Sequence, residues 1–132
     1  MIIWIDADAC PRGIKDIIIK AALRLQVETV LVANQTLAVP ADALIRSVRV
    51  DKGLDVADQY IVEQCGPEDV VITADIPLAD KVVSKGALAI NPRGELYTHE
   101  SIREKLSIRN FMTEMRDAGE VTGGPKPFSD KD

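Results

Sequence analysis

Short apolar segments alternate along this chain with segments that repeat apolar residues every three or four positions, and this alternation most constrains the fold. IIWID (2–6), TVLVA (29–33) and DVVITAD (69–75) have the length and β-branched composition of buried strands. Between them, residues 11–25 and 53–65 repeat with the period of a helix. Buried strands that alternate with helices are typical of a parallel sheet covered on both faces. We therefore predict an α/β fold with three layers, α/β/α, around a mostly parallel central sheet.

The remaining segments complete this order of elements. Residues 45–50 alternate apolar and polar side chains, which predicts a strand with one wet face. A short helix is expected over 77–86 and a last strand over 87–90. Residues 98–118 predict one long or two short helices, and residues 119–132, rich in Gly, Pro and charge, predict an irregular tail.

Composition fits one globular domain with an ordinary core, since 46% of the 132 residues are apolar and 28% are charged. Cys10 and Cys65 are too few for a disulfide framework, which favours a reducing compartment. No segment approaches the ~18 consecutive apolar residues of a membrane span, and the first residues lack the features of a signal peptide. We therefore expect a cytoplasmic protein with no membrane partner. The net charge of −5 argues against a non-specific nucleic-acid coat but not against an enzyme that acts on nucleic acid.

Aspartates directly follow two of the predicted buried strands. Asp6 and Asp8 come at the end of the first strand, and Asp75 ends the segment VVITAD. Ligands of parallel sheets bind beyond the carboxyl ends of the strands, so these side chains share a crevice if the two strands lie near each other. Two carboxylates about 4 Å apart repel by roughly 4 kcal/mol at an effective dielectric constant near 20. A cation is the natural partner for such a pair.

Two helices add further carboxylates. In the helix predicted over 53–65, the spacing of Asp51, Asp55 and Asp58 predicts a stripe on one face. Asp80 is expected at about the first turn of the helix that follows Asp75. Four separate segments thus offer carboxylates to one end of the sheet.

Oxygen ligands alone suit Mg²⁺ or Mn²⁺ better than zinc. Such ions can hold an attacking water and a leaving oxygen during phosphodiester hydrolysis. The chain offers no plausible Ser/His or Cys/His pair, and His99 is its single histidine. We therefore predict a hydrolase that uses Mg²⁺ or Mn²⁺ held by clustered aspartates.

Each of these residues also has a purely structural interpretation. Asp6 or Asp75 could simply cap the helix that follows it, and Asp80 could be an ordinary first-turn acid. The predicted stripe could be a solvated helix face. Cys10 is more simply a buried or capping residue than a reactive thiol, and His99 is expected at the surface. The joint placement of the acids, rather than any one of them, supports a metal site.

Five motifs together resemble a known family and cover nearly the whole chain in order: IDADACPRGIKD, DKGLDVADQYI, VITADIPLAD, INPRGELYT and GPKPFSDKD. They are similar to the YaiI/YqxD family of small bacterial proteins, which is grouped with the PIN-like nucleases. The resemblance implies a single PIN-like domain over 1–118, followed by the tail over 119–132. It also implies a divalent-metal-dependent nuclease whose partner is nucleic acid, RNA more than DNA.

The resemblance also implies roles for individual residues. Metal binding and catalysis would belong to four aspartates: Asp6, Asp58, Asp75 and Asp80. Asp8 and Asp55 would be auxiliary ligands or would position water. Many PIN domains have Glu where Asp58 stands, so the shorter side chain could need a bridging water to reach the metal ion.

Several cationic side chains are candidates for binding substrate phosphates. Arg12 and Lys15 lie in the first turns of the helix beside the acids, where the helix N-terminus also favours an anion. Arg93 lies in the turn NPRG after the last strand, at the same end of the sheet. Candidates for a rim are Arg109 and Arg116. An ordinary surface charge is the alternative for each, and Tyr97 is the only aromatic candidate for stacking on bases.

Three other functions remain open. A haloacid-dehalogenase-type phosphatase would use Asp6 as the phosphorylated residue of the Asp-x-Asp pair with Asp8. A receiver-like module would bind Mg²⁺ at this pair, with Asp51 as phosphoacceptor and Thr73 as switch. A degenerate PIN-like domain would only bind RNA or protein. A homodimer is compatible with any of these functions.

Overall fold

The central sheet has five strands and is parallel throughout. The computed structural model describes residues 1–53 and 55–122, without the side chains of residues 109–111 and 117–122. The strand order is β3-β2-β1-β4-β5, and every neighbouring pair is parallel. The strands are β1 (Ile2–Asp6), β2 (Glu28–Ala33), β3 (Ile45–Arg49), β4 (Val70–Ile72) and β5 (Leu88–Ile90).

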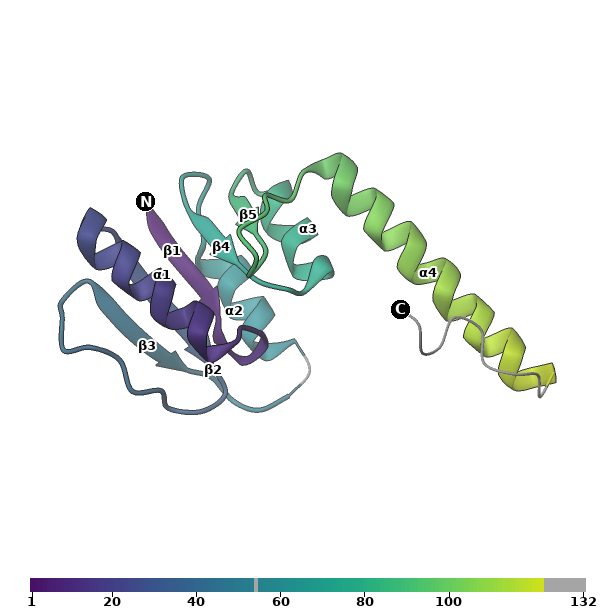
Figure 1. Cartoon of the computed structure of the whole chain (residues 1–132), viewed down its shortest axis with the longest axis horizontal. Coiled ribbons are helices and arrows are strands. Elements are labelled where there is room, and N and C mark those ends of the chain that lie inside the picture. Colours follow the sequence, from purple (N-terminus) through teal and green to yellow (C-terminus); the bar gives the residue numbers. More distant parts are fainter. Residues whose placement is uncertain (54, 123–132) are drawn as a thin grey trace.

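Helices cover both faces of this sheet (Figure 1). They are the 3-10 helix η1 (Ala7–Ala9), α1 (Arg12–Leu25), α2 (Val56–Gln64), α3 (Ile76–Ser84) and α4 (His99–Thr122). On one face, Ile19 and Ala22 of α1 pack with Leu31 of β2. On the other face, Ile61 of α2, side chains of α3 and Ile102 of α4 form a second core cluster. The predicted α/β/α architecture with three layers is therefore confirmed.

The alternation of side chains along β1 determines on which face of the sheet Asp6 lies, and therefore which helices can contribute residues to a site around it. Ile5 belongs to the core cluster on the α1 side, whereas Trp4 belongs to the cluster under α2, α3 and α4. Successive residues of a strand point to opposite faces. Asp6 therefore shares the face of Trp4, on which α2 and α3 pack.

The strand order reverses at β1, and this reversal positions the site. The strands β2 and β3 lie on one side of β1, and β4 and β5 lie on the other. In open parallel sheets, ligands bind at the carboxyl ends of the strands where the order reverses. Ile5 of β1 pairs with Ile72 of β4, so the next residues, Asp6 and Thr73, lie side by side at this point.

The predicted stripe of acids on α2 is wrong. The helix begins at Val56 instead of residue 53, because Asp55 takes a left-handed backbone conformation, with φ of 65°, immediately before it. Asp51 consequently lies outside the helix. Of the three predicted members, only Asp58 lies within α2.

Two later helices also differ in their bounds from the prediction. Because α3 already begins at Ile76, Asp80 lies in its second turn rather than its first. α4 is one continuous helix that includes residues 119–122 of the predicted tail, whereas residues 123–132 lie outside the described residues. The first turns of α4 pack on the core through Ile102 and Leu106, and the helix then extends away from the sheet (Figure 1).

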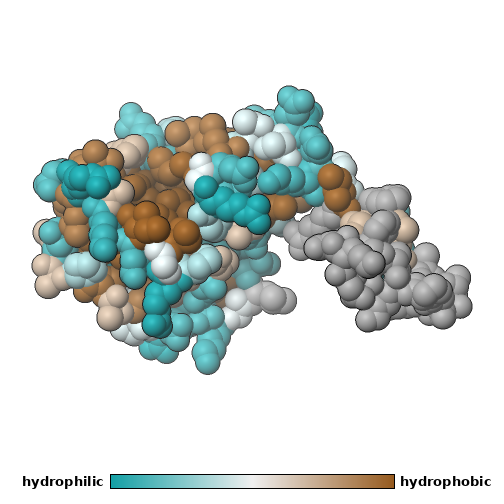
Figure 2. Space-filling model, viewed as in Figure 1, coloured by the Kyte–Doolittle hydropathy of each residue, from teal (hydrophilic) through white to brown (hydrophobic). Residues whose placement is uncertain are grey.

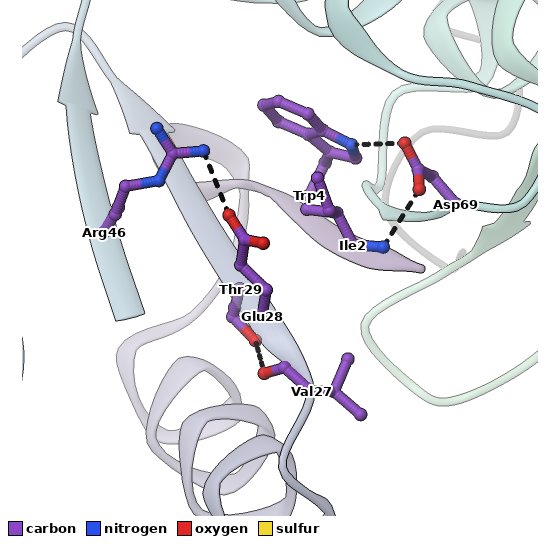
Figure 3. Close-up of polar contacts among 7 residues, drawn as sticks. All are labelled: Ile2, Trp4, Val27, Glu28, Thr29, Arg46 and Asp69. Carbon is purple, nitrogen blue, oxygen red and sulfur yellow. Dashed lines mark hydrogen bonds and ion pairs between the residues drawn. The ribbon is translucent and has the colours of Figure 1, made fainter. Parts of the chain in front are cut away.

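At the opposite edge of the sheet, Asp69 links the beginning of β1 to the loop before β4 (Figure 3). Its Oδ1 accepts a hydrogen bond of 2.9 Å from the Ile2 N–H. Its Oδ2 accepts one of 3.1 Å from the Trp4 indole and one of 2.8 Å from the Gly66 N–H. Burial raises the pKa of Asp69, but these bonds and the N-terminal ammonium outweigh it and leave the pKa lowered. Asp69 is therefore a structural carboxylate, which the sequence analysis did not identify.

The surface carries apolar side chains among polar ones over the face that α1 covers (Figure 2). Ile17 and Leu25 of α1 are exposed. Cys10 and Cys65 are buried and form no disulfide. Among the described residues, no helix combines the length and apolar character needed to cross a membrane.

Candidate functional site

Asp6 is the centre of the candidate site. It ends β1, it is 4% exposed, and its Oδ2 accepts a hydrogen bond of 2.8 Å from the hydroxyl of the fully buried Thr73. Burial raises the pKa of Asp6, the bond from Thr73 opposes this, and the charges of Asp75 and Asp8 raise the pKa further. The net shift is upward, so the surroundings of Asp6 disfavour its negative charge.

Thr73 links Asp75 to Asp6 by hydrogen bonds. The Thr73 hydroxyl accepts a hydrogen bond of 2.9 Å from the Asp75 N–H while donating to Asp6. Asp75 is also the N-cap of α3, because its Oδ1 accepts a bond of 3.0 Å from the Leu78 N–H. The structural interpretation of Asp75 as a cap is therefore correct, and it coexists with a position beside Asp6.

Asp58 joins this pair from α2. It lies in the first turn of the helix and is half-buried. Burial raises its pKa to about 6, together with the negative charges of Asp75, Asp6 and Asp55, while Lys81 of α3 opposes the shift. Because Asp75 acts on Asp6, and both Asp75 and Asp6 act on Asp58, the three residues lie within electrostatic range of one another. We call these three residues the Asp cluster.

The Asp cluster has the donor chemistry of a site for a hard divalent cation, because it offers only carboxylate oxygens. A cation would also relieve the repulsion that raises the pKa of Asp6 and of Asp58. With the side chains as they lie in residues 1–53 and 55–122, no three His, Cys, Asp or Glu residues are grouped closely enough to hold one ion. Binding to all three carboxylates therefore requires their side chains to reorient.

The other predicted acids lie around the cluster. Asp8, in η1, is exposed, and its Oδ2 accepts a hydrogen bond of 2.9 Å from the Asn34 N–H. Asp55 is exposed at the N-cap of α2 and acts on Asp58 through its charge. Asp80 is half-buried on α3, and the charges that raise the pKa of Asp6 and Asp58 belong to other residues. Asp8 and Asp55 thus border the cluster, whereas the charge of Asp80 is not among those that raise the pKa of Asp6 or of Asp58.

The predicted phosphate-binding cations lie at the same edge of the sheet. Arg12, the first residue of α1, is exposed, and Arg93 is exposed in the turn after β5. Lys15 is half-buried, and its Nζ lies 3.4 Å from the carbonyl oxygen of Ala7. Lys81, which the sequence analysis did not single out, is the cation that acts on Asp58. The Arg109 side chain lies outside the described part of the chain, and Arg116 lies far along α4.

Tyr97, the only aromatic candidate for stacking, is not a free stacking platform. It is 6% exposed, its hydroxyl donates a hydrogen bond of 3.2 Å to the carbonyl oxygen of Thr73, and Lys105 Nζ lies 5.4 Å from its ring centroid. Burial, with the charges of Asp75 and Glu95, raises its pKa. Tyr97 instead supports the segment that carries Thr73 and Asp75.

Three other predicted residues have structural positions. Cys10 is buried, and burial raises the pKa of its thiol, so it is not activated as a nucleophile. His99 is exposed at the start of α4, as predicted. Asp51 follows β3, which is separated from β1 by β2. Two strand spacings, about 10 Å, thus separate the strands that end near Asp51 and Asp6, which disfavours the receiver-like arrangement.

The linking role of Thr73 is the main feature that the sequence analysis missed. The motif TAD placed Thr73 two residues before Asp75, and a Thr at this distance can accept from the backbone of the acid. The motif gives no information about the residue that Thr73 meets on the neighbouring strand, which is Asp6 of β1. The bond to Asp6 joins residues 67 positions apart, and it depends on the pairing of β1 with β4.

Comparison with known proteins gives a consistent family. The family model described as "Uncharacterized BCR, YaiI/YqxD family" matches residues 4–132. The chain is 57% identical over 132 residues to UPF0178 protein YaiI of Escherichia coli, covering all of this chain and 86% of that protein. It is 59% identical to a UPF0178 protein of Pseudoalteromonas atlantica and 55% identical to one of Maridesulfovibrio salexigens, again over the whole chain and covering 90% and 87% of those proteins. No solved structure matches the chain. The chain thus belongs to the YaiI/YqxD family, as its motifs predict.

Proposed function

We propose that this protein is a divalent-metal-dependent phosphodiester hydrolase, a PIN-like nuclease that acts on RNA more than on DNA. One observation carries the proposal. At the point where the strand order reverses, the charges of Asp75 and Asp8 raise the pKa of Asp6, and the charges of Asp75 and Asp6 raise the pKa of Asp58. Such crowding of like charge in partly buried positions is costly, and a bound cation would offset it. The preference for RNA rests on the resemblance to PIN-like nucleases.

The Asp cluster would hold Mg²⁺ or Mn²⁺. A divalent cation bound there supplies Lewis-acid chemistry, since it activates a water molecule and stabilises the charge that develops on the phosphoryl group. Asp6 is held by Thr73, and Asp75 is held by its cap bond to α3. The fold thus holds both residues beside each other at one end of the sheet, and their carboxylates would have to turn from these hydrogen bonds toward a shared ion.

We propose for Asp58 a different role from that of Asp6 and Asp75, because it would make metal binding depend on pH. Its pKa of about 6 means that it gains and loses a proton near neutral pH when no cation is present. Metal binding requires the deprotonated carboxylate. Metal affinity should therefore increase as the pH rises through about 6.

Cations around the cluster would orient the substrate. Lys81 lies close enough to Asp58 to lower its pKa, and Lys15 is held at the carbonyl of Ala7, next to Asp6. Lys15, together with Arg12 at the start of α1, would attract a phosphate to the edge of the sheet that carries the Asp cluster.

The test is isothermal titration of Mn²⁺ into the wild type and into Asp6→Asn/Asp75→Asn, followed by cleavage assays on single-stranded RNA and DNA. We expect the double variant to lose roughly 100-fold or more in both Mn²⁺ affinity and cleavage rate. The matched control is Asp16→Asn/Glu63→Gln, which changes net charge equally at exposed residues of α1 and α2. Circular dichroism melting establishes that both variants fold.

The outcomes separate the proposal from its alternatives. Equal Mn²⁺ affinity in the wild type and in Asp6→Asn/Asp75→Asn overturns the metal site. Mn²⁺ binding without cleavage of any nucleic acid leaves a metal-binding module that lacks nuclease activity. Covalent labelling of Asp6 by beryllofluoride indicates the phosphatase mechanism instead.

A further inference from the structure

A groove lies beside the Asp cluster, between the beginning of α1 and the segment that joins β5 to α4. Its volume is about 590 Å³, which is within the range of about 300–1,000 Å³ that is typical of sites for small ligands. Ala74 and Ile76, the neighbours of Asp75 on both sides in sequence, form part of its wall. We call it the α1–α4 groove. It opens at the same edge of the sheet as the Asp cluster, which makes it a candidate for binding part of the same substrate.

Two cations line this groove. Arg93 and Lys105 are both exposed, and in the described part of the chain neither forms an ion pair. Lys105 lies over the ring of Tyr97, which holds its ammonium group at the groove. One acid, Glu95, also lines the groove, and its carboxylate accepts a hydrogen bond of 2.9 Å from the Asn91 amide. The groove therefore carries a net positive charge beside an acidic cluster.

Part of the wall of the groove is apolar. Pro11 is exposed, and Ile14 and Ile76 are only half-buried although they have no polar group to present to water. Such a wall can cover the flat face of a base, and it has no groups that read base edges. A groove that offers both cations and apolar surface matches a nucleotide whose base is unpaired.

We propose that the α1–α4 groove binds one unpaired nucleotide of a single-stranded RNA, next to the phosphodiester that lies at the Asp cluster. Arg93 and Lys105 contact a phosphate of this nucleotide, and its base lies against the wall of Pro11, Ile14 and Ile76. The choice of RNA rests on the proposed nuclease function, whereas the preference for an unpaired nucleotide rests on the groove itself. A base that is paired in a duplex has to be flipped out before its face can lie against such a wall.

The first test removes the charges. Binding of a short fluorescein-labelled oligouridylate to the full chain is measured by anisotropy in EDTA over a series of salt concentrations. We expect Arg93→Ala/Lys105→Ala to weaken binding about tenfold and to reduce the salt slope by about 0.7 for each phosphate that the variant no longer neutralises. Arg103→Ala is the control for losing a single cation outside the groove, since Arg103 lies on α4 about 200° around the helix from Lys105 and does not line the groove.

The second test fills the groove without changing its charge. Ala9 is exposed and lines the groove, so Ala9→Trp should weaken binding of the oligouridylate by at least about fivefold while leaving the salt slope unchanged. A blunt-ended RNA duplex of the same length should bind the wild type more weakly than the oligouridylate. Equal binding of single strand and duplex overturns the preference for an unpaired nucleotide.

These outcomes are distinct from failure of the nuclease proposal. If Arg93→Ala/Lys105→Ala and Ala9→Trp bind the oligouridylate as the wild type does, the groove is not a nucleotide site, even if Mn²⁺-dependent cleavage is found. If both variants lose binding but the wild type cleaves no RNA with Mn²⁺, the groove assignment stands and the catalytic proposal fails.

Discussion

The two ends of the β1–β4 pair each hold a buried aspartate, and the two aspartates are treated in opposite ways. Asp69, immediately before β4, accepts hydrogen bonds from the N–H groups of Ile2 and Gly66 and from the indole of Trp4. Asp6, at the end of β1, accepts one from Thr73 and faces the negative charges of Asp75 and Asp8. One carboxylate is fully satisfied by its own fold, and the other is left among like charges. Only the second arrangement gains from a ligand that the chain does not supply.

The two ends should also respond to pH with opposite signs. The pKa of Asp69 is lowered, so its contribution to stability is present above the ordinary aspartate pKa and is lost as the pH falls through the lowered value. The pKa values of Asp6 and Asp58 are raised, so their contribution is present below the ordinary pKa and is lost as the pH rises. At neutral pH, ionised Asp69 therefore stabilises the fold at one end of the sheet, whereas ionisation of Asp6 and Asp58 reduces stability at the other end.

The comparison predicts its largest effect for Asp69→Ala. This change leaves the N–H groups of Ile2 and Gly66 and the Trp4 indole without their acceptor, so we expect a loss of about 2–4 kcal/mol in the free energy of unfolding. The melting temperature should fall by roughly 10 °C. Affinity for Mn²⁺ should not change, because the length of β1, about 16 Å, separates the two ends.

The control for this prediction is Glu68→Ala, since Glu68 is exposed and adjacent in sequence. Its effect on the free energy of unfolding should stay within about 0.5 kcal/mol. Both quantities are measured by urea denaturation and by titration of Mn²⁺. If Asp69→Ala were as stable as Glu68→Ala, the contrast between the two ends would be wrong.

Thr73→Val should have a smaller effect on stability and a clear effect on the site. The change removes the hydroxyl that bridges Asp6 and the Asp75 N–H, at an expected cost of about 1–2 kcal/mol in the free energy of unfolding. The bond from Thr73 lowers the pKa of Asp6, so its loss should raise that pKa further. Protons then compete more effectively with Mn²⁺ for Asp6, and affinity should fall about fivefold at pH 6.5 and less at pH 8.

Thr73→Ser is the control for this change because it retains the hydroxyl and removes only a methyl group. Titration calorimetry at both pH values separates the two variants. Equal Mn²⁺ affinity of Thr73→Val and Thr73→Ser at pH 6.5 contradicts the positioning role of the hydroxyl.

Much of the frame of the site could be predicted from the sequence. The apolar runs that became β1, β2 and β4 are local patterns, and the rule that ligands bind beyond the carboxyl ends of parallel strands then brings Asp6 and Asp75 to one edge. The condition attached to that prediction, that the two strands lie near each other, is met because β1 pairs with β4. The family could be recognised from the order of its motifs.

The parts that could not be predicted depend on single backbone angles or on partners distant in sequence. The left-handed conformation of Asp55 moves the start of α2, and periodicity alone gives no sign of it. Asp69 has the appearance of an ordinary turn acid until β1 brings Ile2 and Trp4 to it. Tyr97 is buried because its hydroxyl reaches the carbonyl of Thr73, 24 residues away. These contacts exist only after the sheet has formed.

The smallest predicted effect concerns Asp58, whose pKa also could not be derived from sequence. In the absence of metal, the stability that Asp58 contributes is present below its ordinary pKa of 3.8 and is lost as the pH rises through about 6. Asp58→Asn removes the group that ionises. It should therefore be more stable than the wild type at pH 7 to 8, by on the order of 1 kcal/mol in the free energy of unfolding, with no difference near pH 3.5.

Mn²⁺ should reverse the order of these two proteins at pH 7. The wild type gains stability from every ion that binds its folded state, whereas Asp58→Asn has lost a ligand and gains less. Thermal melting with and without Mn²⁺ checks this, with Asp16→Asn, an exposed acid on α1, as the control. A crossing of the two melting temperatures on addition of Mn²⁺ would tie the raised pKa and the metal site to the same carboxylate. If Asp58→Asn instead remains more stable than the wild type at every Mn²⁺ concentration, Asp58 is not a metal ligand, and its raised pKa is unrelated to metal binding.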